Sequence, residues 1–182
     1  MDTALIWLQI ILVDDSSAMQ THWVSVEQCT NLLAFCTTPY DTNGIDLRFM
    51  VSRDKHNSGD YESITKKVHD AKPPPVDSKH TQVANINNVL IRILSKYQEK
   101  IESRRRSSLF SSKDKLKKLI LFILTDGMWG QHSDAETPII NLVNVLKRYG
   151  LPANQVGIQF IKFGNDFVGA ERLRKLDDFL KP

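Results

Sequence analysis

Nearly continuous apolar runs alternate along the chain with segments of helical periodicity. Residues 4–13 and Lys118–Thr125 are almost entirely apolar and predict buried strands, as in parallel sheets that are covered on both faces. Ile45–Ser52 alternates with period two and predicts a half-buried strand. Gln155–Phe163, which ends before a glycine, predicts a further strand.

Apolar residues at three- and four-residue steps predict the helices. They cover residues 18–36, 82–102 and 168–180, with a short one near 61–70 and another capped by Ser133 or Thr137 that runs to Tyr149. The resulting order of strands and helices is typical of an α/β fold. In such a fold the loops after the strands open on one edge of the sheet, where ligands bind.

Length and composition agree with one ordinary domain. The chain has 182 residues, 41% of them apolar and 25% charged, with a net charge of +3. These values exclude a disordered tail, a collagen-like repeat and a disulfide mini-protein, and the small charge surplus requires neither nucleic acid nor a membrane. Residues 4–13 are too few to span a bilayer and have no basic flank, so we expect a strand there.

The cysteines indicate neither a disulfide nor a zinc site. Cys29 and Cys36 lie seven residues apart, which on a helix separates them by about 10.5 Å, too far for a disulfide. No Cys/His cluster has zinc spacing. Two free thiols suit a reducing compartment, and we expect a cytoplasmic protein.

Acidic residues follow the two most apolar runs. Asp14, Asp15 and Ser16 come after the first, and Asp126 comes after the second. If the two strands are neighbours, both carboxylates stay ionised only with a cation between them, and hard oxygen ligands select Mg²⁺, Ca²⁺ or Mn²⁺. The other interpretation is that these residues only cap the first helix. The residue types fit both.

The same segments resemble a known family, the von Willebrand factor type A (vWA) domain in its fungal form. The resemblance rests on an apolar strand that runs into Asp14-x-Ser16, on Thr81 before a long helix, and on Thr125-Asp126-Gly127 after the most apolar strand. The segment Gln155–Gly164, followed by Leu176-Asp177-Asp178, is also similar to that group.

The resemblance implies a doubly wound, mostly parallel sheet with helices on both faces, as in Rossmann-like folds, formed by residues 1–182 as a single domain. It implies a metal-ion-dependent adhesion site (MIDAS), with Asp14, Ser16, Thr81 and Asp126 as ligands of Mg²⁺, Mn²⁺ or Ca²⁺. The function that it implies is protein binding without catalysis, in which a partner carboxylate completes the metal coordination. The loops that carry Asp15, Gln82 and Trp129 would form the contact surface.

The sequence departs from the family pattern in two places. Ala18 stands where the family has a ligand serine, and its methyl group cannot bind a cation. The site is therefore either a weakened Mg²⁺ site completed by water or a degenerate one whose residues only hold loops. The family also continues with one more strand and helix beyond the point where this sequence ends, so we expect a truncated fold with an open sheet edge beside Gln155–Phe163.

Other functions have less support in the residues. A divalent-metal phosphoester hydrolase could use Asp14 as nucleophile, but it needs a second aspartate where Ser16 stands. The basic residues of 102–118 fit a solvated connecting loop better than a nucleic-acid interface. Met19 and Trp23 are expected in the core, whereas Trp129, in a loop, is expected to be an exposed anchor for a protein partner.

Overall fold

One five-stranded sheet forms the centre of the protein in the computed structural model, which describes residues 7–40, 43–73, 81–106 and 116–180. The strand order is β3-β2-β1-β4-β5, and all neighbouring strands are parallel except the antiparallel pair β2–β3. The strands are β1 (Trp7–Val13), β2 (Ile45–Phe49), β3 (Lys55–Ser58), β4 (Lys118–Thr125) and β5 (Val156–Lys162).

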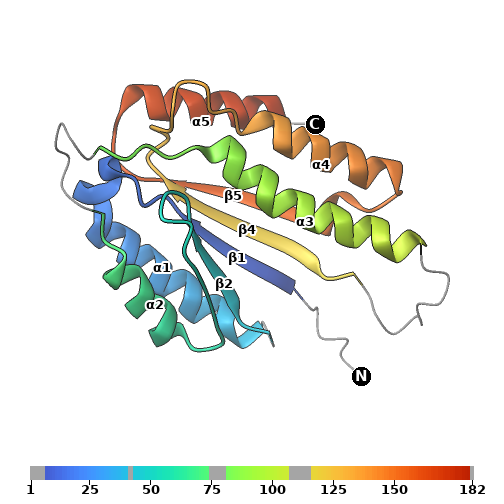
Figure 1. Cartoon of the computed structure of the whole chain (residues 1–182), viewed down its shortest axis with the longest axis horizontal. Helices are drawn as coiled ribbons and strands as arrows, with labels where there is room; N and C mark the ends of the chain where they lie inside the picture. Colours follow the sequence, from blue (N-terminus) through green and yellow to red (C-terminus); the bar gives the residue numbers. More distant parts are fainter. Residues whose placement is uncertain (1–6, 41–42, 74–80, 107–115, 181–182) are drawn as a thin grey trace.

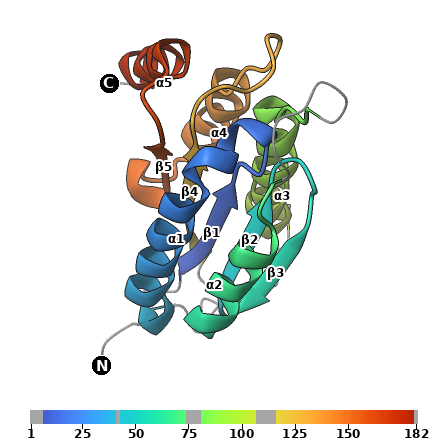
Figure 2. The ribbon, with the colours of Figure 1, turned by 90° about the vertical axis from the view of Figure 1, so that its left-hand side faces the viewer.

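Helices cover both faces of the sheet, which confirms the predicted α/β class (Figure 1). Figure 2 shows the helices divided between the two faces of the sheet. The first face has α1 (Trp23–Thr37) and α2 (Tyr61–Asp70), and the second has α3 (Ile86–Arg106), α4 (Glu136–Arg148) and α5 (Phe167–Leu180). Short 3₁₀ turns add η1 (Ser17–His22), η2 (Thr38–Tyr40) and η3 (Ala153–Gln155).

The central strand β1 contributes to two hydrophobic cores. Ile10 and Leu12 pack under α3 and α4, whereas Ile11 and Val13 pack under α1 and α2. All four side chains are at most 2% exposed, and each contributes roughly 1.5–3 kcal/mol by its burial. Burial on both faces explains why the sequence of this strand is a continuous apolar run and does not alternate.

The predicted core positions on the first helix are confirmed. Met19 and Trp23 are 0% and 1% exposed. The indole N–H of Trp23 donates a hydrogen bond to the Val68 carbonyl oxygen at 3.2 Å, so this side chain joins α1 to α2 and satisfies its own polar atom inside the core.

The boundaries of several elements differ from the sequence prediction. The predicted first helix, residues 18–36, is divided into η1 and α1, which begins only at Trp23. Strand β2 ends at Phe49, before Ser52, because the chain turns back there into β3, a strand that the polar sequence did not predict. Polar residues are tolerated in β3 because, among the described residues, it lies at the sheet edge and pairs only with β2. The third helix begins at Ile86 and not at residue 82, because the Ala84 carbonyl accepts a hydrogen bond from the Gly130 N–H.

The start of α4 is capped by Asp134 and not by Ser133 or Thr137. The Asp134 carboxylate accepts hydrogen bonds from the backbone N–H groups of Glu136 at 2.7 Å and Thr137 at 3.2 Å.

At the opposite side of the sheet from β3, and within the described residues, β5 pairs only with β4. No helix in the described ranges is both long enough and apolar enough to cross a bilayer.

Helix α5 approaches the loop after β4 closely at Gly169. A Cβ atom at this position would lie 2.1 Å from the Asp126 carbonyl oxygen. We expect Gly169→Ala to lower the free energy of unfolding by about 2 kcal/mol or more, although alanine is the better helix former by about 1 kcal/mol. Urea denaturation measures this difference.

Gly157→Ala is the matched control. A Cβ at Gly157 meets no atom within 4 Å, so we expect a change within about 0.5 kcal/mol. Equal stability of the two variants would show that α5 does not pack tightly on the Asp126 loop.

Candidate metal centre

Asp14 and Asp126 follow the two central strands of the sheet. Strands β1 and β4 are neighbours, with Val13 beside Leu124, and the Asp14 N–H donates to the Leu124 carbonyl at 2.9 Å. Both carboxylates are buried, at 0% and 5% exposure. They lie where the chain connections diverge to the two sides of the sheet, the usual ligand site of such folds.

The Asp14 carboxylate is held by two donors. One oxygen accepts a hydrogen bond from the Ser16 backbone N–H at 3.0 Å, and the other accepts one from the Thr125 hydroxyl at 2.8 Å. The pKa of Asp14 is raised from 3.8 to about 6, chiefly by burial and to a smaller extent by the charge of Asp126, while the hydrogen bonds from Ser16 and Thr125 lower it. Burial therefore outweighs the donors.

Ser17 connects the first loop to the segment that carries Thr81. Its backbone N–H donates to the Gln82 carbonyl at 3.1 Å, and its hydroxyl accepts from the Gln82 N–H at 3.0 Å. These bonds place Thr81, the residue before Gln82, beside the Ser16–Ser17 segment. Ala18 is exposed to solvent.

The loop after β4 is fixed from both sides. The Asp126 carboxylate accepts a hydrogen bond from the Met128 N–H at 2.8 Å, and Gly127 has a φ of 83°, which favours glycine. The Arg172 guanidinium of α5 donates to the carbonyls of Gly127 at 3.2 Å and Trp129 at 2.6 Å.

Helix capping does not account for the acidic loop. Ser16 stands at the N-cap of η1 but makes no capping hydrogen bond with its side chain. Asp14 accepts from Ser16 and Thr125, and Asp15 accepts from another loop. The Ser16 side chain is hydrogen-bonded to Asp14 and does not have the capping role that the alternative interpretation required.

Asp15 lies in a loop that was expected to form the contact surface, but its own side chain is only 5% exposed. It accepts hydrogen bonds from the backbone N–H groups of Val51 at 2.7 Å and Ser52 at 3.0 Å. The carboxylate satisfies donors in the turn between β2 and β3, which are otherwise left without a strand partner.

The prediction of an exposed Trp129 is wrong. Its side chain is 5% exposed and packs against Phe160 of β5, with ring centroids 6.4 Å apart. A loop position suggested exposure, but the ring fills the space between β5 and α5.

Gln82 is exposed, as is Met128, at 37%, so these residues remain accessible at this edge of the sheet.

The donor set fits a hard divalent cation with few protein ligands. Two carboxylates and the hydroxyls of Ser16 and Thr81 supply only oxygen atoms, which Mg²⁺ prefers. In the described ranges no group of three or more His, Cys, Asp or Glu side chains could hold a metal. A cation at Asp14 and Asp126 would thus depend on hydroxyl groups, water and a partner.

Two contributors were not predicted as site residues. Thr125 belongs to the quoted Thr-Asp-Gly segment, but only the neighbouring strand reveals that its hydroxyl binds Asp14. Arg172 lies 45 residues from Gly127 in sequence, and no local pattern indicates this contact.

Some predictions concern residues outside the described ranges. Most of the basic segment 102–118, namely residues 107–115, is among them, and so are residues 4–6 of the first predicted strand. Cys29 and Cys36 are both free and lie on α1, in agreement with the spacing argument.

Comparison with solved structures supports a vWA-like fold. Proximal thread matrix protein 1 from the mussel byssus has a TM-score of 0.56 at 16% identity, over 94% of this chain and 41% of that one. Its form with a zinc-occupied MIDAS motif has a TM-score of 0.52 at 16% identity, over 92% and 40%. The manganese-loaded TRAP protein of Plasmodium vivax has a TM-score of 0.52 at 15% identity, over 98% and 65%.

These likenesses establish the fold and nothing finer. The chain spans from about two-fifths to just under two-thirds of the lengths of the matched structures. No protein-family model matches the sequence, and no curated protein matches it.

The separation of Asp15 from the cation site can be tested by substitution. We expect Asp15→Ala to lower the free energy of unfolding by about 2 kcal/mol or more, because the Val51 and Ser52 N–H groups lose their acceptor. Chemical denaturation measures this loss.

Asp54→Ala is the control, since Asp54 lies in the same hairpin but is 57% exposed in its ion pair with Lys67. We expect it to change stability by less than about 1 kcal/mol. A loss as small in Asp15→Ala would mean that Asp15 does not hold the hairpin.

Proposed function

We propose that this chain is a protein-interaction domain that binds its partner through a divalent cation at the loop end of the sheet. The observation that carries the proposal is the pair of buried carboxylates, Asp14 and Asp126, whose mutual repulsion helps to raise the pKa of Asp14. A cation between them would remove that repulsion.

Asp14, Ser16, Thr81 and Asp126 would hold the ion. Mg²⁺ suits this small oxygen set because it keeps several waters when few carboxylates bind it, and Mn²⁺ or Ca²⁺ accept the same ligand class. When bound, the ion supplies positive charge and exchangeable positions that a partner's carboxylate can occupy. Gln82 and Met128, which are exposed nearby, would contact that partner.

The chemistry of Asp14 favours binding over catalysis. A phosphoester hydrolase would use this carboxylate as nucleophile. A second carboxylate two residues later, which would serve as acid and base, is replaced by Ser16.

Calorimetric titration with MgCl₂ tests the cation site. We expect the wild type to bind weakly and Ala18→Ser to bind about tenfold more tightly, because the serine hydroxyl restores a ligand that the alanine lacks. The control is Ala153→Ser, an exposed alanine in η3, which we expect to match the wild type.

Asp14→Asn supplies the complementary measurement. In a chelator we expect this variant to unfold at a temperature at or above that of the wild type, because a buried charge is removed, and MgCl₂ should not stabilise it. Absence of binding in both the wild type and Ala18→Ser would contradict the proposal. Turnover of a generic phosphoester that disappears in Asp14→Asn would favour the hydrolase.

A further inference from the structure

A second surface lies between the β2–β3 hairpin and α3. It is a hollow of about 320 Å³, at the small end of the range for ligand pockets. Its origin is the alternation of β2: Ile45 and Leu47 are buried under α1 and α2, so Asp46 and Arg48 face the other side of the sheet. The hollow forms where this polar side of the hairpin meets α3.

The bottom of the hollow is aliphatic. Val89 and Ile93 of α3 line it and are each 4% exposed, so they offer only a small apolar area at depth. Ile91, also part of its lining, is 44% exposed. An exposed isoleucine beside a hollow is an apolar contact that a bound side chain could cover.

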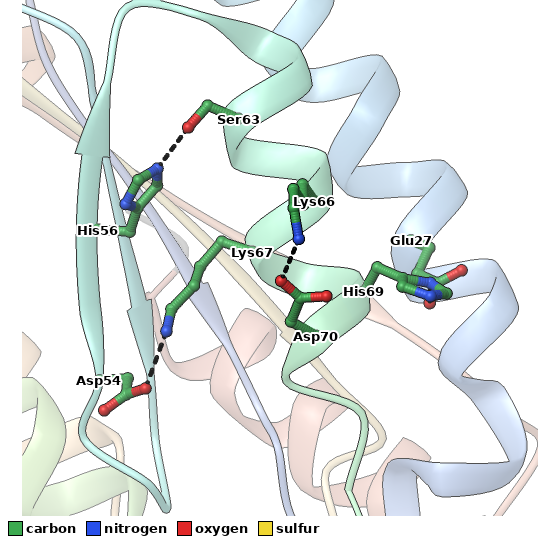
Figure 3. Close-up of polar contacts among 8 residues, drawn as sticks. All are labelled: Glu27, Asp54, His56, Ser63, Lys66, Lys67, His69 and Asp70. Atoms are coloured by element: carbon green, nitrogen blue, oxygen red, sulfur yellow. Dashed lines mark hydrogen bonds and ion pairs between the residues drawn. The ribbon is translucent and has the colours of Figure 1, made fainter.

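Cations dominate the rim. Five of the seven charged residues that line the hollow are basic. One of them, Arg48, is already bound to Asp46. Of the two acids, Asp54 is neutralised by Lys67 of α2 at 3.0 Å (Figure 3).

Helix α2 holds this pairing in place. The imidazole of His56 in β3 is hydrogen-bonded to the Ser63 hydroxyl of α2 at 2.8 Å (Figure 3). With Asp54 engaged toward α2, Glu99 is the remaining carboxylate among the described lining residues.

Four basic side chains at the rim form no ion pair within the described part of the chain. They are Arg53, Lys55, Arg92 and Lys96. Such a cluster creates a positive potential over a partly apolar hollow, which attracts anionic groups and adds hydrophobic contact for an attached apolar group.

We infer that this hollow binds an acidic peptide segment that inserts an apolar side chain between β2–β3 and α3. A peptide fits better than a single-stranded nucleic acid, because the described lining residues offer aliphatic side chains and no exposed aromatic ring on which bases could stack. None of the lining residues belongs to the proposed cation site, so this binding should persist in a chelator.

Arg53 carries an additional observation. Its φ is 62°, and it is the non-glycine residue in the described ranges with a positive φ. This conformation is unfavourable for an L-residue and easy for glycine. Glycine at this position would favour stability, yet the chain has Arg53 there, and its guanidinium lies at the rim of the hollow.

Fluorescence anisotropy tests the inference with a short labelled peptide in which acidic residues surround two leucines. In EDTA at low salt we expect saturable binding that weakens as salt screens the charges. Arg92→Gln/Lys96→Gln should weaken binding about fivefold or more. The matched control is Lys147→Gln/Arg148→Gln, which removes the same charge from an exposed part of α4 and should leave binding unchanged.

Arg53→Gly separates binding from folding. We expect this variant to unfold at or above the wild-type temperature, because the strained φ is relieved, and yet to bind the peptide more weakly. Reduced binding in a variant that is no less stable cannot come from loss of the fold.

Four results would overturn the inference. They are no saturable binding by the wild type, equal losses in the two double variants, equal binding of a peptide whose leucines are changed to serine, and displacement of the peptide by a lower concentration of single-stranded oligonucleotide. The second and third would indicate unspecific charge attraction. None of them bears on Mg²⁺ binding at Asp14, which the calorimetric titration tests independently.

Discussion

The buried hydrogen bond from the Thr125 hydroxyl to the Asp14 carboxylate joins the ends of the two central strands. Parallel pairing of β1 and β4 brings the loops after both strands to one edge, and this bond sets one acidic loop against the other. The Ser17–Gln82 pair and the Arg172 contacts then hold the remaining loops around the same point. Every element of the candidate metal centre depends on this convergence.

The sequence predicted the strands that are buried on both faces better than the one at the edge. Strand β4 has the predicted bounds, because burial on two sides demands an uninterrupted apolar run. Strand β3, Lys-His-Asn-Ser, has no such run. Its position is set by the antiparallel register with β2 and by contacts to α2, which involve residues that a local pattern does not connect.

The site was predictable to the same extent. Asp14 and Asp126 could be assigned from their places after apolar runs, because the end of a strand determines where the next residue lies in the fold. The burial and the contacts of the Asp15 and Trp129 side chains could not be predicted. A carboxylate in a loop turns toward whatever donors are unpaired nearby, here Val51 and Ser52, and an indole turns toward apolar cover, here Phe160. Both choices depend on neighbours that only the fold supplies.

The charged groups of the two proposed surfaces differ in their exposure to solvent, and therefore in how strongly water and salt screen them. At the metal centre the carboxylates are nearly inaccessible, so their repulsion is weakly screened and a small cation has a large effect. At the rim beside α3 the basic side chains are exposed, so each pair with an acid contributes only about 0.2–1 kcal/mol. Binding there cannot rest on charge alone, and the apolar hollow beneath the cations supplies the contact that salt does not screen.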